Sequence, residues 1–203
     1  DKWESRLQEE MEENTRDVNC VVELGAGIFD NFPYYKCPVR IGIELVKSYV
    51  DNRIAGPQTC TMAINGDATK FEDLLPQDLV VDVISLIDFI EHLDKDVALD
   101  LIKRAQKRCR RIIIFSPHGT HNQDGSDSYG FTNGVVKTQV DEAGDTQQAI
   151  EAQRHKSKWY VKDLEDLGFK VNLDTGHHPQ MIWGMKNLIG EDGGAVMWAV
   201  WDK

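Results

Sequence analysis

Two near-adjacent glycines, Gly25 and Gly27, end an apolar segment that begins at Cys20. Because glycine has no Cβ, a ligand can lie directly against the backbone at such a turn. The next apolar run ends at Glu44, which lies 17 residues after Gly27. In open α/β sheets, a glycine turn after one strand and a carboxylate after the next together hold a nucleoside, whose ribose hydroxyls donate to the carboxylate. This spacing predicts a site for a cofactor that contains adenosine.

The residues after the glycine turn help to decide which cofactor the site would take. A dinucleotide site needs a third small residue three positions after the second glycine, so that a helix N-terminus can face the pyrophosphate. Here that position is Asp30, whose charge would repel phosphate, and Pro33 and Pro38 leave room for only about one helical turn. A cofactor without phosphate does not need that helix. The residues therefore favour S-adenosylmethionine over NAD.

Four short motifs follow one another in the order and spacing of a known protein family. They are Glu23-Leu24-Gly25-Ala26-Gly27, Gly42-Ile43-Glu44, Asn65-Gly66-Asp67-Ala68 and the segment from Val81 to Leu93. On these motifs the chain resembles the class I S-adenosylmethionine-dependent methyltransferases, over residues 18–201. The resemblance implies a doubly wound α/β fold with a mostly parallel seven-stranded sheet (a Rossmann-like methyltransferase fold), in which the last strand runs antiparallel between its two neighbours.

The resemblance also implies which residues would bind S-adenosylmethionine and its product, S-adenosylhomocysteine. Asp67 would accept a hydrogen bond from the adenine amino group. Glu23 would fix the glycine turn or reach the amino acid end of the cofactor through water. Structural alternatives stay open, because Asp67 can cap the following turn and Glu44 can be a solvated acid at a strand end. The full set is Glu23, Gly25, Ala26, Gly27, Glu44, Asp67, Ala68, Leu86 and Ile87.

Methyl transfer needs little from the protein beyond alignment, because the sulfonium methyl group is already activated. A base is needed only when the acceptor must lose a proton. His155 and His118 are the candidates for that base, and the alternative for each is a histidine that orders a loop. We interpret Glu91-His92 as the structural start of a helix. The four cysteines have no metal or redox spacing, so the sequence predicts reduced thiols and no metal site.

Alternating strands and helices would position these residues. Near-continuous β-branched runs are typical of strands covered on both faces, and apolar residues recur on one side of the helix expected near residue 100. Such alternation predicts a parallel sheet between two helical layers. The expected strands are Asn19–Leu24, Arg40–Glu44, Thr61–Ile64, Val80–Leu86, Arg111–Phe115, Phe169–Leu173 and Ala195–Trp201, and the expected helices are Val46–Ile54, Phe71–Leu74, Asp94–Arg108 and Trp159–Leu167.

Two long segments without such a pattern interrupt the alternation, at residues 117–157 and 174–194. Loops longer than about 15 residues are usually functional or disordered. The first segment follows the fifth strand, and the second joins the last two strands, so both would lie at the edge of the sheet where a cofactor binds. We expect both to form walls or lids of the acceptor pocket.

Composition limits the class of protein. The chain has 203 residues, 41% of them hydrophobic, and a formal net charge of −11. Its length suits one domain over residues 1–203. An acidic protein repels phosphate backbones, so we expect no nucleic-acid partner, and we interpret six cations between Lys103 and Arg111 as a solvated helix end. No apolar run approaches the ~20 residues that span a bilayer, so we expect no membrane partner. The cysteines, expected to be reduced, favour a cytoplasmic protein.

The sequence thus favours an enzyme that transfers a methyl group from S-adenosylmethionine to a small-molecule acceptor, by O- or N-methylation. Two alternatives stay open. One is a non-catalytic module of the same fold that binds an adenosine cofactor, and the other is an NAD-dependent reductase, which Asp30 disfavours. The residues identify neither the acceptor nor the oligomeric state.

Overall fold

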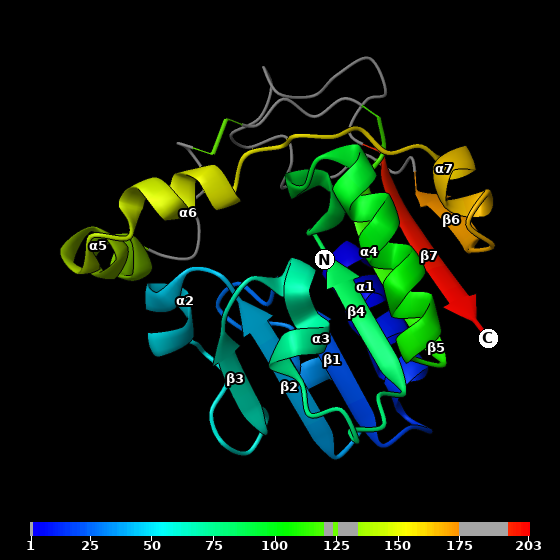
Figure 1. Cartoon of the computed structure of the whole chain (residues 1–203), viewed down its shortest axis with the longest axis horizontal. Helices are drawn as coiled ribbons and strands as arrows, with labels where there is room; N and C mark the ends of the chain where they lie inside the picture. The colour runs from blue at the N-terminus through cyan, green and yellow to red at the C-terminus, as the bar shows by residue number, and fades with distance from the viewer. Residues whose placement is uncertain (1, 120–123, 126–133, 175–194) are drawn as a thin grey trace.

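The computed structural model describes residues 2–119, 124–125, 134–174 and 195–203, and a seven-stranded sheet forms its centre (Figure 1). The strands lie in the order β3-β2-β1-β4-β5-β7-β6. Neighbouring strands are parallel except at β7, which runs antiparallel to both β5 and β6. The expected fold class is confirmed, including the place of the last strand. The strands are β1 (Cys20–Leu24), β2 (Val39–Glu44), β3 (Met62–Asn65), β4 (Val83–Ile87), β5 (Arg111–Pro117), β6 (Lys170–Asp174) and β7 (Val196–Asp202).

Helices cover both faces of the sheet. In Figure 1, α3 (Phe71–Leu74) and α4 (Lys95–Arg108) lie in front of the strands, α1 (Lys2–Thr15) lies behind them, and α7 (Val161–Glu165) lies beside β6. α4 packs on the sheet because its apolar residues recur every three or four positions on one side. Those residues are all buried, and they are Ala98, Leu101, Ile102 and Ala105.

In the segment that follows β1, the chain forms only one short helical turn, and aromatic side chains cover the sheet instead. That turn is η1 (Phe32–Tyr34), a 3-10 helix with a proline near its start, as the two prolines predict. Phe29, Phe32 and Tyr35 are fully buried, and the ring centroids of Phe29 and Phe32 lie 4.9 Å apart. A Cβ at Gly42 in β2 would lie 2.2 Å from the Phe29 ring. The aromatic rings therefore fasten this segment to the sheet.

Two parts of the chain form helices that the sequence pattern does not predict. Half of the residues of α1 are charged, and its apolar contacts with the core beside the sheet include buried Met11 and partly buried Leu7, so its periodic signal is weak. Residues 117–157, expected to be irregular, contain α5 (Gly134–Ala143) and α6 (Thr146–Ala152). Of the second expected loop, 174–194, only Asp174 is among the described residues. None of the helices in the described ranges is long and apolar enough to cross a membrane.

The other elements differ from expectation mainly at their ends. The helix expected at Val46–Ile54 is the shorter α2 (Lys47–Asp51), because Asn52 leaves the helix and its side-chain amide donates to the Ser48 carbonyl. β4 begins three residues later than expected, at Val83. Val80 is 73% exposed and so cannot belong to the buried sheet.

Ion pairs hold the basic segment at the end of α4. Arg104 pairs with Glu72 at 2.5 Å and with Asp100 at 2.7 Å, and Arg111 pairs with Asp202 at 2.7 Å. Because β5 begins at Arg111, the segment lies at the N-terminal edge of the parallel strands, whereas ligands bind at the C-terminal edge. These ion pairs agree with the structural interpretation of the six cations.

Asp82 joins the start of β1 to the loop before β4, and its loss should destabilise the sheet. Its Oδ2 accepts from the backbone N–H groups of Asn19 at 2.8 Å and Cys20 at 3.0 Å. We expect Asp82→Ala to lower the free energy of unfolding by about 2–4 kcal/mol, because both donors lose their acceptor. Urea denaturation measures the effect, and exposed Asp78 offers a matched control, Asp78→Ala, which should stay within about 0.5 kcal/mol of wild type. Equal losses in the two variants would contradict this role.

Candidate functional site

The glycine turn after β1 lies at the edge where the parallel strands end. The N–H groups of Gly25 and Ala26 both donate to the Ile43 carbonyl of β2, at 2.9 and 3.1 Å. Gly25 and Gly27 both have positive φ, at +74° and +53°. A Cβ at Gly25 would lie 2.2 Å from the Phe89 ring, whereas a Cβ at Gly27 would meet nothing within 4 Å. Gly27 therefore presents bare backbone to open space, and Phe89 takes the room at Gly25.

Glu44, at the end of β2, turns its carboxylate toward this glycine turn. One oxygen accepts from the Gly27 N–H at 2.9 Å, and the other accepts from the Val46 N–H at 2.8 Å. Glu44 is only 6% exposed, and burial raises the pKa of its carboxyl from 4.5 to about 7 although the backbone hydrogen bonds oppose the shift. The turn and the carboxylate thus lie together, as their spacing predicts. Each carboxylate oxygen can accept a second hydrogen bond, so capacity for ribose hydroxyls remains.

Glu23 lies within β1, two residues before Gly25, and is completely buried. Its Oε1 accepts from the Asn31 amide at 2.7 Å, which ties the segment after the glycine turn back to the strand. Its Oε2 has no hydrogen-bond partner in the part of the chain that the structure describes. Burial raises the pKa of this carboxyl well above its usual value. The Asn31 bond agrees with the expectation that Glu23 fixes the turn.

Asp67 and Ala68 follow β3 and begin a short 3-10 turn, η2 (Ala68–Lys70). Asp67 Oδ1 accepts from the Thr69 N–H at 2.9 Å, so the residue caps this turn. This is the structural role that the sequence leaves open beside cofactor binding. The side chain of Asp67 is nevertheless 43% exposed. Leu45, which directly follows β2, is also 41% exposed. An apolar side chain that is open to solvent at a ligand-binding edge can cover one face of a planar base.

Leu86 and Ile87 end β4, and both are buried. Leu86 packs in the core on one face of the sheet and Ile87 in the core on the other face, so mainly their backbone is available to a ligand. The chain then turns at Asp88, whose φ is +46° and whose N–H donates to the Phe115 carbonyl at 3.0 Å.

Four carboxyl groups gather at the ends of β1 and β4. Glu23 and Glu91 are buried, whereas Asp30 and Asp88 keep an exposed face. Desolvation by the surrounding chain and the negative charge of Asp30 raise the pKa of Asp88 to about 7. Burial and the charge of Asp88 raise the pKa of Glu91 well above its usual value. Within the described ranges no lysine or arginine pairs with any of the four, so this edge attracts cations.

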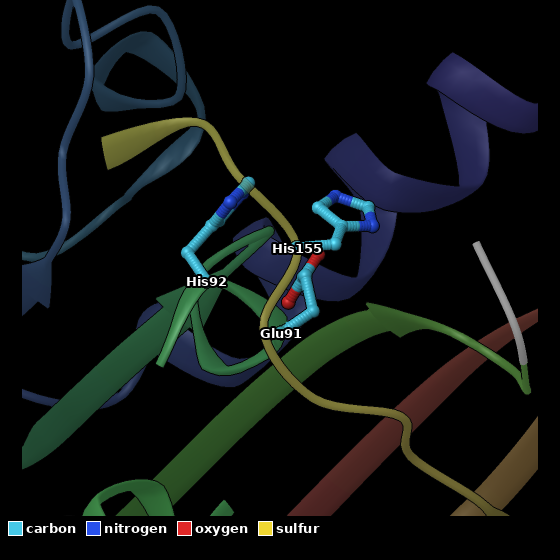
Figure 2. A group of neighbouring side chains, drawn as sticks. All are labelled: Glu91, His92 and His155. Atoms are coloured by element: carbon cyan, nitrogen blue, oxygen red, sulfur yellow. The ribbon is translucent and has the colours of Figure 1, made fainter. Parts of the chain in front are cut away.

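A cluster of three side chains, Glu91, His92 and His155, brings together two distant segments of the chain (Figure 2). Their possible ligand atoms all lie within 4.8 Å of one another. The rings of His92 and His155 meet edge to face, with centroids 4.8 Å apart. Glu91 and His92 do belong to a helical turn, η3 (Ile90–His92), as expected. The sequence did not predict that His155 lies beside this turn.

The two histidines expected as candidate bases lie in different surroundings. His155 belongs to the Glu91, His92 and His155 cluster, whereas His118 packs against the Tyr160 ring with centroids 5.4 Å apart. The His118 N–H donates to the Ala195 carbonyl at 2.9 Å, which places this residue at the end of the β5 and β7 pair. His155 is the candidate that faces other chemically capable side chains.

Hydrogen bonds hold the segment after α6 against η3. The N–H groups of Lys156 and Ser157 donate to the Glu91 carbonyl at 2.8 and 3.1 Å, and the Trp159 indole N–H donates to the Ser157 hydroxyl at 2.9 Å. Figure 1 shows this segment crossing the C-terminal edge of the sheet between α6 and α7. His155 is therefore held in place by its neighbours, and no pattern in the sequence reveals this contact.

The helices α5 and α6 pack at the other end of the same edge. The Ser48 N–H of α2 donates to the Asp145 carboxylate at 2.9 Å, which joins α2 to the start of α6. A buried apolar cluster completes the contact. Its members come from the glycine turn, α2 and its approach, α5 and α6, and they are Ile28, Val46, Tyr49, Val140 and Ala149. α5 and α6, which belong to the segment expected to be irregular, thus pack beside the glycine turn and α2.

Solved structures of the same fold are similar to this chain. A methyltransferase from Archaeoglobus fulgidus that depends on S-adenosylmethionine has a TM-score of 0.60 and 16% identity, with 98% of this chain and 92% of that chain covered. The methyltransferase domain of a bacterial Hen1 protein has a TM-score of 0.53 and 16% identity, over 98% of each chain. The plantazolicin methyltransferase BamL, solved with a triazolic desmethylPZN analogue and S-adenosylhomocysteine, has a TM-score of 0.52 and 12% identity, with 98% of this chain and 82% of that chain covered.

No protein-family model and no curated protein matches the chain. The likeness to these solved structures establishes the class I methyltransferase fold, which the four sequence motifs imply.

The carboxyl of Glu44 should make stability depend on pH. Because its folded pKa of about 7 lies above the ordinary value of 4.5, its contribution to stability is complete below about pH 4.5 and is lost as the pH rises through 7. A shift of this size corresponds to about 3 kcal/mol. We therefore expect the free energy of unfolding of wild type, relative to that of Glu44→Gln, to fall by up to about 3 kcal/mol between acid and mildly alkaline pH.

Urea titrations of both proteins at several pH values measure this difference, and the other buried carboxyls cancel because both proteins share them. The exposed Glu13 provides the matched control, Glu13→Gln, whose difference from wild type should not change with pH. A constant difference for Glu44→Gln as well would show that Glu44 titrates normally.

Proposed function

We propose that this protein is a methyltransferase that uses S-adenosylmethionine. The observation that carries the proposal is the contact between the Glu44 carboxylate and the Gly27 N–H at 2.9 Å, beside backbone that faces open space. In this fold, that arrangement provides an acceptor for ribose hydroxyls and a surface without a Cβ for the ligand.

The surrounding residues suit the chemical parts of this cofactor. The exposed apolar side chain of Leu45 can cover the adenine, and the exposed side of Asp67 can accept from its amino group. Asp30, and Asp88 when it is ionised, carry negative charge at the edge, which favours the ammonium and sulfonium groups. A pyrophosphate would meet the same charges with repulsion, so these residues disfavour NAD.

S-adenosylmethionine supplies an activated methyl group when it is bound, and the role of the chain is to hold the acceptor in line with it. Alignment of two reactants can lower the barrier by roughly 7–11 kcal/mol. The carboxyl groups contribute to binding more than to rate, because the sulfonium charge that they attract disappears during the transfer.

For the acceptor, we favour a small molecule. The net charge of −11 and the carboxyl groups at the edge oppose a polyanionic substrate. RNA is a second candidate, because Arg154, Lys156 and Lys158 are exposed around His155 and because one similar structure is described as a small RNA methyltransferase. Fluorescence anisotropy with a short single-stranded RNA distinguishes the two, since an RNA substrate should bind in a salt-dependent manner and a protein specific for small molecules should not bind it.

Titration calorimetry with S-adenosylmethionine tests the proposal directly. Binding to the folded protein is expected, and its absence at millimolar ligand would refute the proposal. A change in nicotinamide fluorescence on addition of protein would instead favour the reductase. The non-catalytic alternative is excluded if S-adenosylhomocysteine accumulates with any natural acceptor.

Gly27 and Gly144 form a matched pair of sites for a mutational test. Both have positive φ, and at both a Cβ would point into open space, so alanine at either should cost about 1–2 kcal/mol of stability. Only Gly27 faces the candidate cofactor site. We expect Gly27→Ala to weaken the binding of S-adenosylhomocysteine at least tenfold, and Gly144→Ala to leave it near the wild-type value. Calorimetry measures both, and equal affinities for the two variants would place the cofactor elsewhere.

A further inference from the structure

We propose that Glu91, His92 and His155 bind a divalent first-row transition-metal ion. Their ligand atoms, two imidazole nitrogens and a carboxylate oxygen, lie within 4.8 Å of one another (Figure 2). Around an ion with bonds of about 2.0–2.2 Å, ligand atoms lie about 3–3.5 Å apart, so small side-chain rotations bring these three into place. The sequence predicts no metal site, because its spacing rules see only ligands that are close along the chain.

The donor set indicates the class of metal. Mg²⁺ and Ca²⁺ prefer sites made of oxygen atoms, whereas imidazole suits zinc, cobalt, iron and nickel. Three protein ligands also leave coordination positions open, which is typical of catalytic rather than structural sites. The cluster therefore suits an ion that binds a further ligand from outside the protein.

A hydrogen bond already orients His92 for such a role. Its Nδ1 lies 3.3 Å from the Arg154 carbonyl oxygen. A carbonyl oxygen can only accept, so Nδ1 carries the proton in this contact and Nε2 keeps its lone pair. Metal-binding histidines commonly donate their other ring N–H to a carbonyl in this way.

Glu91 provides an independent observation that a ligand is missing. The residue is 3% exposed, and its Oε2 accepts from the Ser116 hydroxyl at 3.2 Å. Its Oε1 is buried and accepts no hydrogen bond from an N–H group or hydroxyl of the described residues, and the carboxyl of Asp88 lies beside Glu91. An unsatisfied buried carboxylate oxygen is costly, and a cation beside it would remove that cost.

The position of the cluster suggests what the ion would do, and this step rests on the proposed methyltransferase function. η3 follows β4 after two residues, so the cluster lies at the same edge as the glycine turn, whose Gly25 touches the neighbouring Phe89 ring. An ion there would bind an acceptor hydroxyl and lower its pKa. In the transfer, the methyl–sulfur bond breaks, a methyl–oxygen bond forms, and the hydroxyl proton passes to water. The site thus favours O-methylation.

Titration of the chelator-treated full chain with Co²⁺ tests the site without any methyl acceptor. We expect visible absorption bands of protein-bound cobalt and one ion per chain by calorimetry. His155→Asn and Glu91→Gln should each weaken Co²⁺ binding at least tenfold, and His118→Asn, outside the cluster, should bind as wild type does.

Two results would overturn the site: no Co²⁺ binding by wild type at millimolar concentration, or equal affinity in wild type and His155→Asn. Circular dichroism checks that each variant is folded. If Glu91→Gln does not fold, His155→Asn decides alone, because His155 lies on a connecting segment and is only partly buried.

A second measurement tests whether the ion lies near the cofactor. Mn²⁺ is paramagnetic, so it should broaden the methyl resonance of bound S-adenosylmethionine in wild type but not in His155→Asn, and Zn²⁺ should cause no broadening. Sharp resonances with both ligands bound would refute the role in O-methylation. If S-adenosylmethionine does not bind, the proposed function and this role fail together, whereas the metal site still depends on the Co²⁺ titration alone.

Discussion

The carboxylate of Glu44 connects the two turns that form the candidate cofactor site. It accepts hydrogen bonds from the N–H groups of Gly27 and Val46, and it thereby ties the turn after β1 to the turn after β2. Two bonds from one buried side chain hold these backbones in one arrangement without any help from a ligand. The cost of that arrangement is a carboxyl in poorly hydrated surroundings, which is why its pKa rises to about 7.

The aromatic residues after the glycine turn serve a related purpose by different means. Because η1 is only three residues long, large buried side chains cover the sheet in its place, those of Phe29, Phe32 and Tyr35. Phe29 has a φ of +63°, a conformation that costs energy for a residue with a Cβ, and the close contact of its ring with Gly42 compensates for it. The glycine turn is therefore held both by the packing of these aromatic rings on the sheet and by the hydrogen bond to Glu44.

The sequence was sufficient to predict the sheet and the pairing of the glycine turn with Glu44, because both follow from patterns within short stretches. It was less informative wherever distant segments meet. Gly25 belongs to the glycine motif, yet its missing Cβ makes room for Phe89, 64 positions later. His155 could be named as a candidate but not placed beside His92, since only the folded segment after α6 brings them together. α5 and α6 are short, with 10 and 7 residues, so too few positions repeat for their periodicity to separate them from a loop.

The placement of α5 and α6 has a thermodynamic consequence. Asp145, at the start of α6, holds α2 through the Ser48 N–H, and His155 follows the other end of the same helix after two residues. One helix thus connects α2, beside the glycine turn, to the segment that carries His155. Any ligand that stabilises α6 at one end also favours the bound arrangement at the other. By linkage, if two ligands both stabilised this helix, each would raise the affinity of the other by the same factor.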